Sequence, residues 1–329
     1  MEEVGVKQKG RLWGKVLVLL GGGLLLAAAV RIGGKLVTSD VLRRRDRERI
    51  NVFVSILPQK FFVERIGGER VTVSVMVGPG QNPATYEPLP QQMKALTEAH
   101  IYFRIGVPFE TAWLDRLSAL NPELIMVDTR EGIALRQMEH HSCHAPAVET
   151  AEPDAAAHHR AGLPDPHIWL DPLLVKIQAE TVYRALAAFD PEHQGYFKAN
   201  LDRFHAELEQ LHAELQAIFD GLEKKTLMVY HPAWGYLADR YGLKQVALEV
   251  EGKEPGPREL AQLIDYAKAE GIRVIFIQSQ FDAKAAEAVA RAVNGRVVTI
   301  DPLAEDYLTN MRRIVQAIKG SYETSGKSD

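Results

Sequence analysis

The stretch LDRFHAELEQLHAELQAIFDGL, residues 201–222, decides how this chain folds. Its large apolar side chains follow one another at intervals of three and four residues, so they share one face of a helix. They are Leu201, Phe204, Leu208, Leu211, Leu215, Ile218 and Leu222. This spacing predicts an amphipathic helix of about 30 residues, which would be about 45 Å long.

An apolar stripe of this kind also occurs in dimeric coiled coils, where two chains bury it against each other. Only about three heptads are present here, and segments with a mixed strand and helix pattern flank both ends. We therefore interpret the stripe as a single helix that joins two α/β lobes as a rigid spine.

Short apolar runs alternate with helical stretches on both sides of this helix. The runs lie at residues 50–56, 71–77, 101–105, 124–127, 227–230, 274–277 and 297–300. Strands separated by helices are typical of parallel sheets. Two Asp-Pro pairs, Asp171-Pro172 and Asp190-Pro191, predict helix starts. We predict an α/β fold with an N-terminal lobe over residues 50–172, linker and spine helices over 173–224, and a C-terminal lobe over 225–325.

The first 37 residues have the pattern of a signal peptide or an N-terminal anchor. Lysine and arginine residues precede an uncharged apolar run over residues 16–30, which is short for a membrane span. Ala27 and Ala29 provide a cleavage pattern, whereas an uncleaved anchor would continue through Ile32 and Leu36. Both interpretations place the rest of the chain outside the cytoplasm, in the periplasm or at the outer face of the cytoplasmic membrane. Residues 38–49 are predicted to be a solvated linker.

The composition excludes several classes of protein. With 46% hydrophobic and 25% charged residues, the chain is neither wholly disordered nor a multi-span membrane protein. Its net charge of −4 and the lack of a basic stripe give no indication of a nucleic-acid partner. The single cysteine, Cys143, excludes a disulfide framework, a CxxC zinc site and an iron–sulfur cluster.

Three side chains that bind metals well stand next to prolines at the ends of predicted elements. His231 and Asp301 each follow a predicted strand, and His167 precedes a predicted helix. Ligands of open α/β sheets bind beyond the carboxyl ends of the strands. Two imidazoles and one carboxylate suit Zn²⁺ or a similar divalent ion. Taken singly, each residue also fits an ordinary structural role, as a helix N-cap or a hydrogen-bonded histidine.

Four motifs resemble the zinc/manganese solute-binding proteins of bacterial ABC importers. They are GQNPATYEPLP at residues 80–90, PDPHIWLDP at 164–172, YHPAWGYL at 230–237 and DPL at 301–303. The likeness extends over residues 51–318. It implies two α/β lobes bridged by a long rigid helix, a metal ion held in the cleft between the lobes, and docking of the loaded protein on a membrane permease.

One position departs from the family pattern. The family's first histidine ligand stands just before Thr-Tyr-Glu-Pro, where this chain has Ala84. Carried over by resemblance, the metal site keeps His167, His231 and Asp301 and has one position open. A water molecule, a histidine from the histidine-rich stretch over residues 139–160 or another side chain would have to complete it. The candidate side chains are Glu87, Gln278 and Gln280.

Residues 139–160 form a histidine-rich stretch without helical or strand periodicity. Its histidines are His140, His141, His144, His158 and His159. Clustered imidazoles bind Zn²⁺ weakly, and in the zinc-specific branch of the family such a loop collects metal. A solvated insertion with incidental histidines has the same pattern. The imidazole at His231 and this stretch favour Zn²⁺ over Mn²⁺ or Fe²⁺ as the bound ion.

These observations predict a monomeric extracytoplasmic binding protein that captures a divalent metal ion and delivers it to an ABC importer permease. An enzyme is a second interpretation, because two histidines, an aspartate and an open position also describe a catalytic zinc site with Glu87 as general base. No HExxH motif or nucleophile elbow supports it. A third interpretation is a metal-binding adhesin or storage protein with a degenerate site.

Overall fold

The computed structural model describes residues 29–32, 35–38, 49–138, 164–249 and 252–323. The chain divides into two compact units, residues 1–48 and residues 49–329. In the first unit, β1 (Ala29–Ile32) pairs antiparallel with β2 (Lys35–Thr38). The predicted apolar run over residues 16–30 lies outside the described residues except for its last two. A search of the described part found no helix with the length and apolar character of a membrane span.

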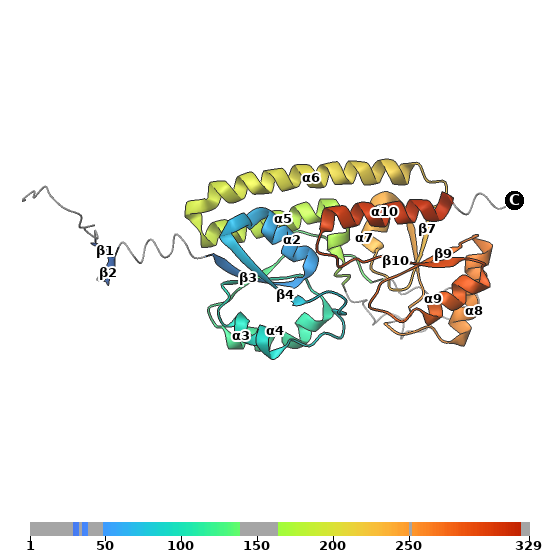
Figure 1. The fold of residues 1–329 in the computed structure, drawn as a ribbon, viewed down its shortest axis with the longest axis horizontal. Helices are drawn as coiled ribbons and strands as arrows, with labels where there is room; N and C mark the ends of the chain where they lie inside the picture. The colour runs from blue at the N-terminus through green and yellow to red at the C-terminus, as the bar shows by residue number, and fades with distance from the viewer. Residues whose placement is uncertain (1–28, 33–34, 39–48, 139–163, 250–251, 324–329) are drawn as a thin grey trace, which may run out of the picture. The chain divides into compact units, whose positions relative to one another are not determined.

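The N-terminal lobe of the second unit is built on a four-stranded parallel sheet. Its strands are β3 (Ile50–Ile56), β4 (Val71–Val77), β5 (Ile101–Arg104) and β6 (Ile125–Asp128), in the order β4-β3-β5-β6. Helix α2 (Leu57–Gly67) lies on one side of the sheet, and α3 (Pro90–Leu96) and α4 (Pro108–Leu120) on the other (Figure 1). The central strand β3 is buried along nearly its whole length, because helices cover both of its faces.

The C-terminal lobe contains a second four-stranded parallel sheet. Its strands are β7 (Thr226–Val229), β8 (Lys244–Ala247), β9 (Val274–Ile277) and β10 (Arg296–Thr299), in the order β10-β9-β7-β8. Its helices are α7 (Gly235–Tyr241), α8 (Pro257–Ala269), α9 (Lys284–Ala292) and α10 (Tyr307–Glu323). The two sheets confirm the predicted α/β class. Strand β8 was not predicted, because two of its four residues, Lys244 and Gln245, are polar.

Two helices connect the lobes, and both begin near the predicted Asp-Pro pairs. Helix α5 (Pro172–Phe189) is capped by the carboxylate of Asp171, which accepts a hydrogen bond of 2.8 Å from the amide of Leu173. Helix α6 (Gln194–Asp220) follows a single 3₁₀ turn and has 27 residues, which makes it about 40 Å long. Phe189, the last residue of α5, is 40% exposed and packs on His100.

The apolar face of α6 is buried within the chain. Five members of the predicted stripe are fully buried: Leu201, Phe204, Leu208, Leu211 and Leu215. Phe204 packs on Phe62 of α2, with 5.9 Å between the ring centroids, and Phe219 packs on Tyr241 of α7 at 5.1 Å. The stripe therefore stabilises contacts between the lobes, as the single-helix interpretation predicts. Its buried side chains are not available to pack against a second chain in a coiled coil.

Polar contacts along α6 also reach both lobes. The side-chain amide of Asn200 donates to the carbonyl oxygen of Ile66 in α2 at 2.8 Å. The Nε atom of Arg312 in α10 donates to Oε2 of Glu214 at 2.6 Å. Figure 1 shows α6 running beside α5, α2 and α10. Tyr307, at the start of α10, packs edge-on against Phe62, with 5.0 Å between the centroids. One continuous hydrophobic core therefore extends from the N-terminal lobe through the spine into the C-terminal lobe.

This shared core predicts that the two lobes unfold together. Leu208→Ala should lower the free energy of unfolding by about 2–5 kcal/mol, because it removes a fully buried side chain and leaves a cavity. Urea unfolding followed by circular dichroism should give one transition with a lower midpoint. Leu120→Ala, at a position that is 43% exposed, is the matched control and should change the free energy by less than about 0.5 kcal/mol. Two separate transitions would contradict the prediction.

Candidate metal centre

The carboxyl ends of the C-terminal lobe's strands bring four polar residues to one edge of the sheet. His231 follows β7, Glu249 follows β8, Gln278 follows β9 directly and Asp301 follows β10. Because the strands are parallel and hydrogen-bonded in one sheet, these residues leave it on the same side. The sequence predicted this edge for His231 and Asp301 from the same rule.

His231 is held by a short turn and by a carboxylate. The amide of Ala233 donates to the carbonyl oxygen of His231 at 2.8 Å, across Pro232. The Nδ1 atom of His231 lies 2.7 Å from Oε2 of Glu249, whose side chain is 8% exposed. The ring of Phe281 stacks on the imidazole, with 5.3 Å between the centroids. One face and one nitrogen of this histidine are thus fixed.

His167 has a similar arrangement at the entrance to the spine. Asp165 accepts from the backbone amide of His167 at 3.0 Å and from its Nδ1 atom at 2.7 Å, so the carboxylate fixes both the turn and the ring. Asp165 is 1% exposed and His167 is 9% exposed. Burial lowers the pKa of His167, and the neighbouring Asp165 carboxylate opposes this effect. A neutral imidazole is the form that binds a metal.

The two histidines come from different lobes and lie next to each other. Their ring centroids are 5.2 Å apart, with an angle of 69° between the planes. When the Nδ1 atom of a neutral imidazole donates to the neighbouring carboxylate, the Nε2 atom of that ring carries the lone pair. This arrangement of carboxylate, histidine and free Nε2 is the one found around zinc ligands.

Asp301 lies at the same sheet edge. Its Oδ1 atom accepts from the amide of Leu303 at 2.8 Å, and the next residue, Pro302, accepts from the indole nitrogen of Trp169 at 2.8 Å. This second bond joins the Asp301 segment to the 3₁₀ turn that follows His167 (Ile168–Leu170). Among the described residues, no three His, Cys, Asp or Glu side chains are arranged so that together they could hold a metal ion. The structure thus brings the two histidines together, and Asp301 as their common partner stays a prediction.

The predicted substitute ligands differ in their surroundings. Gln278 is 2% exposed, and its Nε2 atom lies 3.4 Å from the carbonyl oxygen of His231. Its Oε1 atom is buried and has no hydrogen-bond partner in the described part of the chain. The Nε2 atom of Gln280 is also buried without such a partner there. Ala84 and Glu87 are both exposed, in the segment that follows β4.

The predicted metal-collecting histidines fall outside the described residues. They are His140, His141, His144, His158 and His159, and Cys143 lies in the same segment.

Sequence reasoning missed the two carboxylates that hold the histidines. Asp165 stands two residues before His167 in the motif Asp165-Pro166-His167, and this short spacing could have indicated that its carboxylate contacts the imidazole. Glu249 is eighteen residues from His231 and follows β8, the strand that was not predicted. Only the position of β8 beside β7 brings it to the site.

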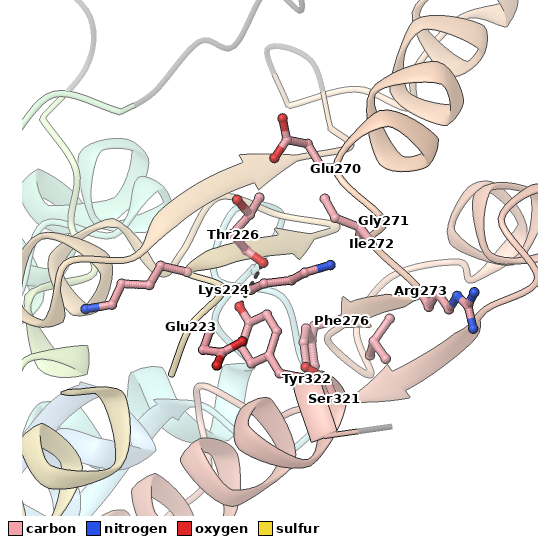
Figure 2. Close-up of a pocket in the computed structure, with 12 residues that line it drawn as sticks. Glu223, Lys224, Thr226, Glu270, Gly271, Ile272, Arg273, Phe276, Ser321 and Tyr322 are labelled. Atoms are coloured by element: carbon pink, nitrogen blue, oxygen red, sulfur yellow. Dashed lines mark hydrogen bonds between the residues drawn. The ribbon is translucent and has the colours of Figure 1, made fainter. Parts of the chain in front are cut away.

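A separate pocket lies at the opposite ends of the same strands. It has a volume of about 280 Å³ and is lined by the segment before β7, the loop between α8 and β9, and the end of α10. Figure 2 shows Lys224, Glu270 and Arg273 around it, and a hydrogen bond from Tyr322 to the carbonyl oxygen of Thr226. No histidine is among its described lining residues. We therefore place the candidate metal centre at the carboxyl edge of the sheet.

Comparison with known proteins agrees with the predicted resemblance. The family model for ZnuA, the periplasmic component A of the zinc-uptake complex, matches residues 52–321. The zinc-binding protein AdcA of Streptococcus pyogenes serotype M3 is 24% identical over 295 residues, covering 85% of this chain and 57% of the relative. This chain therefore spans little more than half the length of that relative.

Solved structures give the same result. A crystal structure of ZnuA is 41% identical, with a TM-score of 0.76, and the match covers 84% of this chain and 100% of the other. A ZnuA deletion variant solved with zinc bound is 40% identical, with a TM-score of 0.75, covering 84% of this chain and 98% of the other. The chain therefore belongs to the ZnuA family, the periplasmic component A of zinc-uptake complexes.

Proposed function

We propose that this protein binds a divalent metal ion outside the cytoplasm and delivers it to the permease of an ABC importer. The observation that carries the proposal is the pair of adjacent histidines, each with a buried carboxylate on Nδ1. Both Nε2 atoms are thereby left for a ligand that accepts electron pairs. The names of ZnuA and AdcA, a zinc-uptake component and a zinc-binding protein, support the same function.

Zn²⁺ is the ion we propose. Neutral imidazoles suit zinc, whereas Mn²⁺ prefers sites built from oxygen ligands. The zinc bound in the related ZnuA variant agrees with this choice. The proposed ligands are His167, His231 and one carboxylate oxygen of Asp301, whose segment is joined to the His167 turn by the bond from Trp169 to Pro302.

The shared core supports a capture mechanism with little movement of the lobes. Side chains of α6 and α10 pack against both lobes, so a wide opening would expose apolar surface along the spine. Metal binding then needs only side-chain rearrangement and small shifts at the sheet edge. Release of the ion requires the permease to change the positions of the metal-binding side chains, or protons to displace the ion from the histidines.

We propose that the protein carries its ion without catalytic turnover. In the hydrolase interpretation Glu87 would be the general base, yet this residue is exposed on the segment after β4, in a region of loop structure. The periplasmic assignment of the family supports the extracytoplasmic location. We further propose that the protein acts as a monomer, because the leucine stripe of α6 is buried in its own chain.

Zinc titration in competition with a chromophoric chelator tests the proposal. The full chain should bind one Zn²⁺ much more tightly than a peptide of residues 139–160. His167→Ala and His231→Ala should each weaken this binding by more than about 100-fold, because each removes a direct ligand and so exceeds the loss typical of an outer partner. His212→Ala, in α6, is the matched control and should bind as the unchanged chain does. Binding no tighter than that of the peptide would refute the proposal.

The carboxylate beside His231 should contribute to affinity without touching the ion. Glu249→Gln keeps the size of the side chain and removes the charge that orients the imidazole, so zinc binding should weaken by about 10–100-fold. The same competition titration measures it. Asp282→Asn, in the exposed loop after β9, is the control and should have no effect. Equal affinities for Glu249→Gln and its control would contradict the assigned role.

Gln278 is the candidate we favour for the open position, because its buried Oε1 atom lies at the sheet edge between β7 and β10. Gln278→Leu should weaken zinc binding by about 10-fold, whereas Gln278→Glu keeps an oxygen ligand and should bind at least as tightly as the unchanged chain. Isothermal titration separates the two variants. If Gln278→Leu binds zinc normally, a water molecule or a residue outside this edge completes the site.

A further inference from the structure

A closed ring of hydrogen bonds joins Arg136, Asp165 and Tyr236. The backbone amide of Arg136 donates to the hydroxyl of Tyr236 at 3.0 Å, and that hydroxyl donates to the carbonyl oxygen of Asp165 at 2.9 Å. The amide of Asp165 donates back to the carbonyl oxygen of Arg136 at 2.8 Å. Gln137 and Pro164 pair as an isolated antiparallel bridge next to this ring. Tyr236 of α7 thus holds the segment that leads to His167 through two hydrogen bonds of its hydroxyl group.

The side chain of Arg136 also forms an ion pair with the carboxylate of Asp165. Its Nη1 atom lies 3.6 Å from Oδ2 of Asp165, the oxygen that does not face His167. Its Nε atom lies 3.1 Å from Oδ2 of Asp239 in α7, and its guanidinium carbon lies 5.8 Å from the centre of the Tyr236 ring. The guanidinium therefore stands between two residues of α7 and the carboxylate that orients His167.

The first residue of α7 leaves room for this guanidinium. A Cβ atom at Gly235 would lie 1.1 Å from Nη1 of Arg136 and 2.3 Å from its guanidinium carbon. Any side chain at this position would therefore displace the arginine. Gly235 also stands four residues after His231, at the end of the turn that holds that histidine. The start of α7 is thus in contact with both ligand segments.

We propose that Arg136 is a positioning residue for the metal centre. Held by Tyr236 and Asp239 of α7, its guanidinium fixes the Asp165 carboxylate, which in turn sets the direction of the His167 imidazole. Through this connection the C-terminal lobe, which supplies His231, also determines where the Nε2 atom of His167 points. The inference rests on the proposed function, since it concerns the geometry of the same zinc site.

Zinc competition titrations on full-chain variants test this role. Arg136→Met should weaken zinc binding by about 10–100-fold, as removal of an outer partner of a metal ligand does. Gly235→Ala should act in the same direction, because the added methyl group pushes the guanidinium away. Arg312→Met removes the arginine paired with Glu214 and is the matched control, with zinc binding unchanged. Normal zinc binding by Arg136→Met would overturn the proposal.

A double-mutant cycle with Asp165→Asn separates positioning from general loss of stability. If Arg136 acts through Asp165, Arg136→Met should have little further effect on zinc affinity in the Asp165→Asn background. Independent effects that multiply would show a merely structural role and refute the inference. Thermal unfolding without zinc identifies variants that do not fold, and Arg136→Lys then replaces Arg136→Met. It should weaken zinc binding too, because an ammonium group lacks the planar fork of the guanidinium.

Failure of this inference is distinguishable from failure of the proposed function. If the unchanged chain does not bind zinc tightly, the proposed function is wrong. If it binds zinc tightly and Arg136→Met does so equally well, only the role of Arg136 is wrong.

Discussion

The apolar face of α6 needs both lobes to bury it. Its first half packs on α2, where Phe204 meets Phe62, and its second half packs on α7, where Phe219 meets Tyr241. Helix α6 is about 40 Å long, and its buried side chains belong to one core that includes residues of both lobes. The relative position of the lobes is therefore set by the same burial that stabilises the fold.

This constraint determines the distance between the two histidines. His167 enters the spine from the N-terminal lobe, and His231 leaves the sheet of the C-terminal lobe, so their 5.2 Å separation depends on how the lobes are joined. Each imidazole is accompanied by a carboxylate that is nearly inaccessible to water. Burial of a carboxylate costs free energy unless it accepts strong hydrogen bonds. Here the bonds also orient the rings, which is the property a metal site requires.

The sequence predicted those parts of the fold that depend on local pattern. The stripe of α6 and most strands are visible from the spacing of apolar residues, and the start of α5 is visible from the pair Asp171-Pro172. Strand β8 was missed because Lys244 and Gln245 interrupt its apolar pattern.

The two histidines of the candidate site could be predicted from the sequence, but the residues that orient them could not. His231 and Asp301 follow strands, a rule that needs only the strand assignment. Glu249 reaches His231 through the pairing of β7 with β8, and Arg136 reaches Asp165 through a contact with α7, neither of which a one-dimensional pattern contains. The residues that contact the histidines from outside the site therefore depend on contacts between segments that are distant in the sequence.

The pairing of Gln137 with Pro164 has a consequence for how the approach to His167 tolerates substitution. Next to this bridge, the amide of Asp165 donates to the carbonyl oxygen of Arg136, so the contacts that begin the segment use main-chain atoms. Main-chain donors and acceptors are shared by nearly all residue types. A different side chain at Gln137 therefore leaves the start of this segment where it is.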